Sequence, residues 1–198
     1  MLWGAIAVCA AIGGFWLARE LHSTSPALAS GTWFPQARQL RDFSLIDESG
    51  HTLNLRTLKG KPALVFFGFT HCPDVCPTTL VTLAQARKAS QISNLQVLLI
   101  SVDPARDTPE VLERYVHAFD PAFRGATGPQ ATIDAVTKDF GVAVQRVELP
   151  GGDYTMDHSA AVFLLDDAAH IAAVFTAPIE AATLAADLRA IAPRLSAG

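Results

Sequence analysis

The sequence predicts a mixed α/β fold in which helices cover both faces of one β-sheet. Two continuous apolar runs, residues 63–69 and 95–102, are each followed by a helical pattern, which is typical of buried strands joined by crossover helices. Two further runs, residues 160–165 and 171–175, are separated by a short polar turn and precede a last helical pattern. The chain therefore predicts one mixed sheet with helices on both faces.

A short β-hairpin is expected ahead of this sheet. Its strands would be residues 43–46 and 51–55, joined by Asp47-Glu48-Ser49-Gly50, with Gly50 supplying the left-handed turn dihedral. The first buried strand, residues 63–69, then leads directly to Cys72.

The remaining elements follow from capping residues and apolar spacing. Pro73 or Thr78 opens a helix that continues to about Lys88, and Thr108 is the expected N-cap of a helix beginning with Pro109. We also expect a helix over 132–140, a strand over 142–147 and a closing helix over 179–191. This order, with its added N-terminal hairpin, fits a thioredoxin-like fold.

The N-terminal segment is expected to be a membrane anchor. Residues 1–18 contain no charged side chain and are about long enough to cross a bilayer as one helix. Trp3 and Trp16 near its ends suit the two membrane interfaces. A cleaved signal peptide is the alternative, although a basic region before the apolar run is missing. Cys9 within the segment is interpreted as a small apolar residue.

Composition divides the rest of the chain and excludes one function class. Residues 19–35 are rich in Ser, Pro and Gly and predict a linker, so residues 36–198 are the expected thioredoxin-like domain. The net charge of -4 and the pI near 5.8 provide no basic surface for nucleic acid.

Cys72 and Cys76 are the only cysteines outside the predicted anchor. A spacing of four is one helical turn, so a helix beginning near Pro73 would place both sulfurs on the same face. Two chemistries are then open, a disulfide or a shared metal ion. Soft thiolates select copper(I), zinc or iron–sulfur clusters, but two thiolates alone require at least one further ligand.

Histidine is the natural third ligand, and two of the six candidates are placed to supply it. His158 stands immediately before the strand over 160–165, which should run beside the strand that leads to the cysteines. His71 adjoins Cys72, but neighbouring side chains in an extended segment point apart, so it is the weaker candidate. The other histidines fit structural or solvated positions: His22, His51, His117 and His170.

Three blocks of sequence resemble one family. The stretch FFGFTHCPDVCPTTL, followed by SVDPARDTPEVLERYV and DYTMDHSAAVFLLD, resembles the Sco (SenC) copper-binding proteins of cytochrome c oxidase assembly. Weaker agreement in GTWFPQARQLRDFSLIDESG and RGATGP extends the resemblance over roughly residues 31–190.

The resemblance implies a function and a site. Members of this family bind copper through Cys-x-x-x-Cys and a distant histidine, which here are Cys72, Cys76 and His158. It implies a carrier of Cu(I) and Cu(II) rather than an enzyme, with the copper-bearing oxidase subunit or another copper carrier as partner. It also implies a bacterial inner-membrane protein whose copper domain faces the periplasm.

A thiol-disulfide oxidoreductase or peroxidase using the Cys72–Cys76 pair is the alternative. Its dithiols usually have two intervening residues, whereas this chain has three, and such an exchanger needs no imidazole at position 158. Asp74, Asp157 and Met156 are expected to tune the site, to meet a partner or to serve structural roles. The charges of Asp103, Arg106 and Asp107 are interpreted as bracing their loop.

Overall fold

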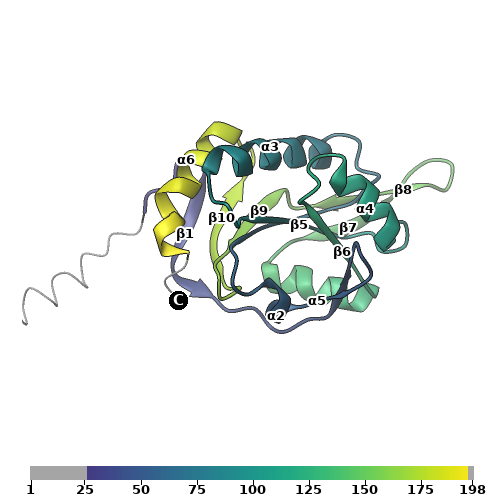
Figure 1. Ribbon diagram of the computed structural model, residues 1–198. Helices are drawn as coiled ribbons and strands as arrows, with labels where there is room; N and C mark the ends of the chain where they lie inside the picture. Colours follow the sequence, from purple (N-terminus) through teal and green to yellow (C-terminus); the bar gives the residue numbers. More distant parts are fainter. Residues whose placement is uncertain (1–25, 196–198) are drawn as a thin grey trace, which may run out of the picture.

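The computed structural model describes residues 26–195 (Figure 1). Within that range no helix has the length and apolarity needed to cross a membrane, and the predicted anchor, residues 1–18, lies outside it. The elements are β1 (Gly31–Arg38), β2 (Leu45–Asp47), β3 (Thr52–Leu53), α2 (Leu55–Leu58), β4 (Ala63–Gly68), α3 (Val75–Ser90), β5 (Gln96–Ser101), α4 (Pro109–His117), β6 (Arg124–Thr127), α5 (Gln130–Phe140), β7 (Val144–Glu148), β8 (Tyr154–His158), β9 (Ala161–Leu165), β10 (Ile171–Thr176), α6 (Ala181–Ile191) and a 3-10 turn (Ala192–Arg194).

Four strands form the predicted core of the fold. β4 pairs in parallel with β5, and on its other side it pairs antiparallel with β9, which pairs antiparallel with β10. Helices α3 and α6 pack together over one face of the sheet, and α5 covers the other (Figure 1). The expected mixed sheet and its flanking helices are confirmed.

Additional strands extend this core to eight, in the order β1-β10-β9-β4-β5-β6-β2-β3. The predicted hairpin is present as β2 and β3, and it joins the sheet through β6. Its second strand is shorter than expected because Asn54 forms a capping box with Thr57, so Leu55 begins helix α2.

The folded region begins before the predicted start at Gln36. Strand β1 begins at Gly31 and pairs antiparallel with β10 at the sheet edge, where Pro35 is tolerated. The backbone N–H groups of Ala29 and Ser30 donate to the buried carboxylate of Asp187 in α6, at 2.9 and 2.8 Å. The last residues of the predicted linker, 19–35, are therefore part of the domain.

Strands β7 and β8 form a separate two-stranded ribbon, with the pairing running from Val144↔His158 to Glu148↔Tyr154. The sequence predicts β7 but not β8. In Figure 1 the tip of this ribbon projects from the body of the domain. The ribbon matters because His158 is its last residue.

Candidate metal centre

Strand β4 carries the chain to the cysteines. Every residue of β4 is buried, and after Phe69 the backbone turns through Thr70 and His71. The N–H of Cys72 closes this turn by donating to the carbonyl of Phe69, at 3.3 Å. Cys72 is half-buried at the edge of the sheet, so its sulfur is held by the core while one side stays open to solvent.

Helix α3 begins at Val75, between the two predicted starting points, Pro73 and Thr78. The side chain of Asp74, the N-cap, makes no capping hydrogen bond, and the N–H of Cys76 donates instead to Sγ of Cys72, at 3.3 Å. Cys72 thus lies outside the helix and is joined to Cys76 by a capping contact, not by stacking along a helical face as expected.

Cys76 lies fully buried beneath this cap. A Cβ added to Gly68 would lie 3.0 Å from Sγ of Cys76 and 3.0 Å from Cε1 of Phe66. The absence of a side chain at the end of β4 therefore makes room for the second sulfur.

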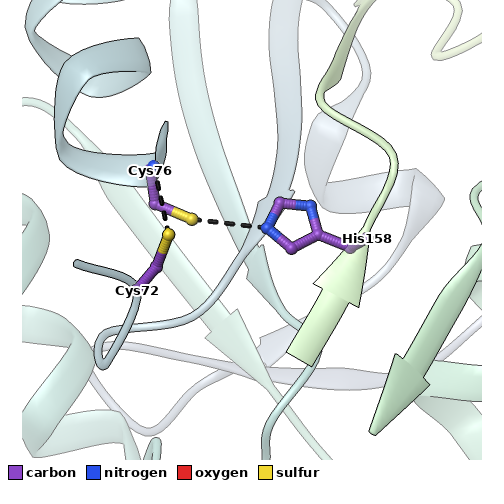
Figure 2. A group of neighbouring side chains, drawn as sticks. All are labelled: Cys72, Cys76 and His158. Carbon is purple, nitrogen blue, oxygen red and sulfur yellow. Dashed lines mark hydrogen bonds between the residues drawn. The ribbon is translucent and has the colours of Figure 1, made fainter. Parts of the chain in front are cut away.

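His158 reaches the same place from the end of β8. Because β9 pairs with β4 in the register Phe66↔Val162, the chain just before β9 lies beside the carboxyl end of β4. Nε2 of His158 is 3.4 Å from Sγ of Cys76 (Figure 2). Nδ1 of His158 is 3.3 Å from the carbonyl oxygen of Ser159. That carbonyl can only accept, so Nδ1 carries the proton and Nε2 presents a lone pair to the sulfurs.

Two aromatic rings fix the orientation of the imidazole. Phe66 and Phe69 meet the ring of His158 edge-on, with centroids 5.9 and 6.0 Å away. Both phenylalanines belong to the segment that leads to the cysteines. The same stretch of chain therefore positions the two sulfurs and the imidazole.

Burial favours the neutral forms of Cys76 and His158. Desolvation raises the pKa of the Cys76 thiol far above its usual range, and the hydrogen bond with Cys72 adds to the effect. Desolvation also lowers the pKa of His158, although the Ser159 carbonyl opposes this. A cation entering the site would find a neutral imidazole and would displace a proton from Cys76.

The structure brings together the three residues that the sequence singles out. One ligand atom each from Cys72, Cys76 and His158 lies within 4.8 Å of the others, and both cysteines are free thiols. Among residues 26–195 this is the only such group of His, Cys, Asp or Glu side chains. Two thiolates and one imidazole suit a soft or borderline ion such as copper or zinc.

The other candidate residues have other surroundings. His51 is exposed in the β2–β3 hairpin, and His170 lies 3.7 Å from Asp166 in a turn. His71 is exposed and contacts Thr70, while His22 falls outside the described residues. The side chain of Asp74 accepts only from the hydroxyl of Thr78, at 3.4 Å, so it caps no backbone N–H at the helix start.

The predicted charge cluster braces its loop, and it also braces the site. The fully buried carboxylate of Asp107 accepts from the N–H and the hydroxyl of Thr70, at 3.1 and 2.6 Å, and from the hydroxyl of Ser101, at 2.6 Å. Thr70 lies two residues before Cys72. This contact ties the cysteine turn to β5.

Arg106 performs the same task for the ribbon. It pairs with Asp103 at 2.5 Å, donates to the carbonyl of Tyr154 at 3.1 Å and lies 3.7 Å above the Tyr154 ring. The hydroxyl of Tyr154 in turn donates to Asp103 at 2.8 Å. Sequence reasoning missed Tyr154, whose only signal was a polar aromatic residue four positions before His158 on the same face of a strand.

Fold and site together define a thioredoxin-like domain with a dithiol–imidazole group at the carboxyl end of its central strand. The SCO1/SenC family model matches residues 34–193, and the chain belongs to that family. A SCO2-like protein of Rickettsia felis is 41% identical over 129 residues, which cover 63% of this chain and 63% of that protein. The match thus spans less than two thirds of that relative.

Solved structures agree with the family assignment. The copper-bound ScoI of Arabidopsis thaliana is 31% identical, with a TM-score of 0.74, covering 78% of this chain and 98% of that one. The copper-bound ScoI of Bradyrhizobium japonicum is 39% identical, with a TM-score of 0.70, covering 76% and 97%.

Proposed function

We propose that this chain is a copper carrier that binds the ion through Cys72, Cys76 and His158 and delivers it to the binuclear copper centre of cytochrome c oxidase during assembly. The observation that carries the proposal is the convergence of two sulfurs and one imidazole nitrogen within 4.8 Å. Such a set accommodates both Cu(I) and Cu(II). The copper-bound structures of two relatives support the choice of copper over zinc.

The surroundings of the site suit release as well as binding. Cys72 is half-exposed, and a cleft of about 350 Å³ opens beside the imidazole, lined by Ala143, Val144, Gln145, Asp157, His158 and Ser159. A partner could therefore approach the ion from the side of Cys72 or of His158. Cys76, fully buried, is the ligand that we expect to leave last.

The proposal includes a location. Residues 1–18 would anchor the chain in a bacterial inner membrane, with the copper domain facing the periplasm and the copper-bearing oxidase subunit or another copper carrier as its partner. The apolar, Trp-flanked segment and the family resemblance support this placement. A reporter fused to Gly198 should be active on the periplasmic side; activity confined to the cytoplasm would refute this topology.

Copper titration of the full-length chain tests the site. The parent should bind one Cu(I), whereas His158→Ala should bind at least roughly 10- to 100-fold more weakly, since even groups that only orient a ligand cost that much. His170→Ala is the matched control, because it removes an imidazole from a turn outside the group of three. Equal affinity and an unchanged absorption spectrum in His158→Ala would refute the proposed carrier site.

The same cysteines favour a second candidate function. Cys72 and Cys76 are both free and in contact through the 3.3 Å capping bond. A Cys72 thiolate could attack a partner's disulfide, and Cys76 could then release the partner as a dithiol while the pair becomes a disulfide. Reduction of an oxidised copper-site peptide from the partner should depend on both cysteines and not on His158. No reduction by the parent protein would exclude this role.

A further inference from the structure

A chain of hydrogen bonds leads from the protein interior to a histidine outside the group of three. The chain begins at the buried carboxylate of Asp107, which accepts from three donors: the N–H of Thr70, the hydroxyl of Thr70 and the hydroxyl of Ser101. The hydroxyl of Ser101 itself accepts from the N–H of Asp103, at 3.0 Å, so its own proton points to Asp107. All three contacts donate toward the carboxylate and favour its ionised form, although desolvation raises the pKa of Asp107.

This arrangement fixes which group donates in the hydrogen bond between Thr70 and His71. The single proton of the Thr70 hydroxyl is used in the 2.6 Å bond to Asp107, so the oxygen can only accept from its other neighbour. That neighbour is Nδ1 of His71, 3.1 Å away. His71 must then carry its proton on Nδ1, which leaves the lone pair on Nε2.

His158 has the same tautomer for a comparable reason, since its Nδ1 faces the carbonyl of Ser159. Imidazoles that bind metals usually donate the other ring N–H to a carbonyl or carboxylate, which orients the ring and raises its basicity. His71 has this preparation, relayed from Asp107 through Thr70. A solvated histidine on a surface turn has no need of it.

The position of His71 suggests when such a ligand would act. It is exposed, it adjoins the half-exposed Cys72, and it does not belong to the group that converges on Cys76. His71 is therefore an exposed neighbour of Cys72 in the chain and lies outside the group of three ligand candidates.

We propose that His71 is a transient outer ligand that binds copper through Nε2 while the ion enters or leaves the Cys72–Cys76–His158 site. During release the bond from copper to His158 breaks and a bond to His71 forms, with the thiolates still bound and no change in oxidation state. This inference rests on the proposed carrier function and assigns it an exit route.

The tautomer can be tested on the metal-free protein. Long-range proton–nitrogen NMR of the full-length chain, at a pH where the histidines are neutral, should show His71 protonated on Nδ1. Thr70→Val should release that preference, and Thr70→Ser should retain it. An Nε2-protonated His71 in the parent would overturn the inference.

The transfer step is tested with bicinchoninic acid as the Cu(I) acceptor. His71→Ala should transfer copper roughly tenfold more slowly or worse, with equilibrium affinity and absorption spectrum unchanged. His51→Ala, an exposed histidine at the far edge of the sheet, is the control and should transfer at the parental rate.

Each other outcome has a defined meaning. A transfer rate in His71→Ala within twofold of the parent would overturn the inference and leave the carrier function intact. A loss of affinity like that in His158→Ala would also overturn it, because His71 would then be a resting ligand. A parent protein that binds no Cu(I) would refute the carrier function itself.

Discussion

The candidate site joins two regions that are built in different ways. The cysteine segment continues from β4, which is buried along its whole length and paired on both sides, and enters α3. The ribbon that carries His158 has only two strands and is partly exposed throughout. A two-stranded ribbon is marginal on its own, so contacts with the body must position His158.

Those contacts are both polar and apolar, and Val144 and Met156 of the ribbon pack against the hydrophobic core. Arg106 and Asp103 hold Tyr154, and the rings of Phe66 and Phe69 meet His158 itself. The cysteines thus depend on the hydrophobic core, whereas the imidazole depends in addition on a local latch formed by Asp103, Arg106 and Tyr154. Substitutions in the first region should reduce the stability of the domain, and substitutions in the second should mainly reduce metal affinity.

Loss of a thiolate should have the largest effect. Cys76→Ser should weaken Cu(I) binding by more than roughly 100-fold, exceeding the loss in His158→Ala, because the soft ion prefers sulfur. Competition with a Cu(I) chelator measures both variants. A smaller loss in Cys76→Ser than in His158→Ala would contradict the view that the thiolates contribute most of the Cu(I) affinity.

Lowering the pH should cause the next largest loss of Cu(I) affinity. The raised pKa of Cys76 means that its thiol is protonated at neutral pH, so copper binding releases at least one proton. Apparent affinity should therefore fall as pH falls, by roughly tenfold or more per unit between pH 8 and 7. Proton release measured by calorimetry in two buffers checks the sign. Affinity independent of pH in this range would contradict a protonated Cys76 in the empty site.

Gly68→Ala should disturb the packing of the cysteine segment at the end of β4. The added methyl group would lie 3.0 Å from Sγ of Cys76 and 3.2 Å from Cδ1 of Leu99, so the packing must shift. We expect a loss of about 1–3 kcal/mol in unfolding free energy, as for other overpacked cores. Urea denaturation measures it, with Gly128→Ala as a comparison, whose Cβ would meet Leu45 but no cysteine. An unchanged unfolding free energy in Gly68→Ala would show that the space between Gly68 and Cys76 is not tightly packed.

Tyr154→Phe should have the smallest effect and should act on the ribbon alone. It removes the 2.8 Å bond from the Tyr154 hydroxyl to Asp103 and keeps the ring between Arg106 and Arg146. Loss of one hydrogen bond of about 1 kcal/mol corresponds to roughly fivefold in copper affinity. The melting temperature of the metal-free chain should change little. A large drop in that temperature with unaltered affinity would argue against a latch that positions His158.

Much of this organisation could be predicted from the sequence because its signals are local. Continuous apolar runs specified β4, β5, β9 and β10, and Thr108 with Pro109 marked the start of α4, where the Thr108 side chain accepts from Val111. The three side chains that the sequence singled out do converge, although their role as copper ligands remains a proposal. The chemistry of these residues and a distinctive motif were sufficient to predict that the three side chains lie together.

The rest depends on pairing partners that are distant in the chain. The strand β8, Tyr154-Thr155-Met156-Asp157-His158, has no apolar alternation that would predict a strand. Its pairing with β7 holds it in place. β1 has the Gly and Pro content of a linker and becomes a strand only against β10. A fully buried Asp107 cannot be told from a solvated loop carboxylate by sequence, so its connection to Thr70 and His71 appeared only with the structure.

The central claim is that one imidazole and two thiolates hold the same ion. X-ray absorption spectroscopy of the full-length chain loaded with one Cu(I) tests it most directly. The parent should show two sulfur scatterers and one nitrogen scatterer with the outer-shell pattern of an imidazole, and that pattern should disappear in His158→Ala while both sulfurs remain. A parent spectrum without imidazole, or one that His158→Ala leaves unchanged, would contradict the proposed site.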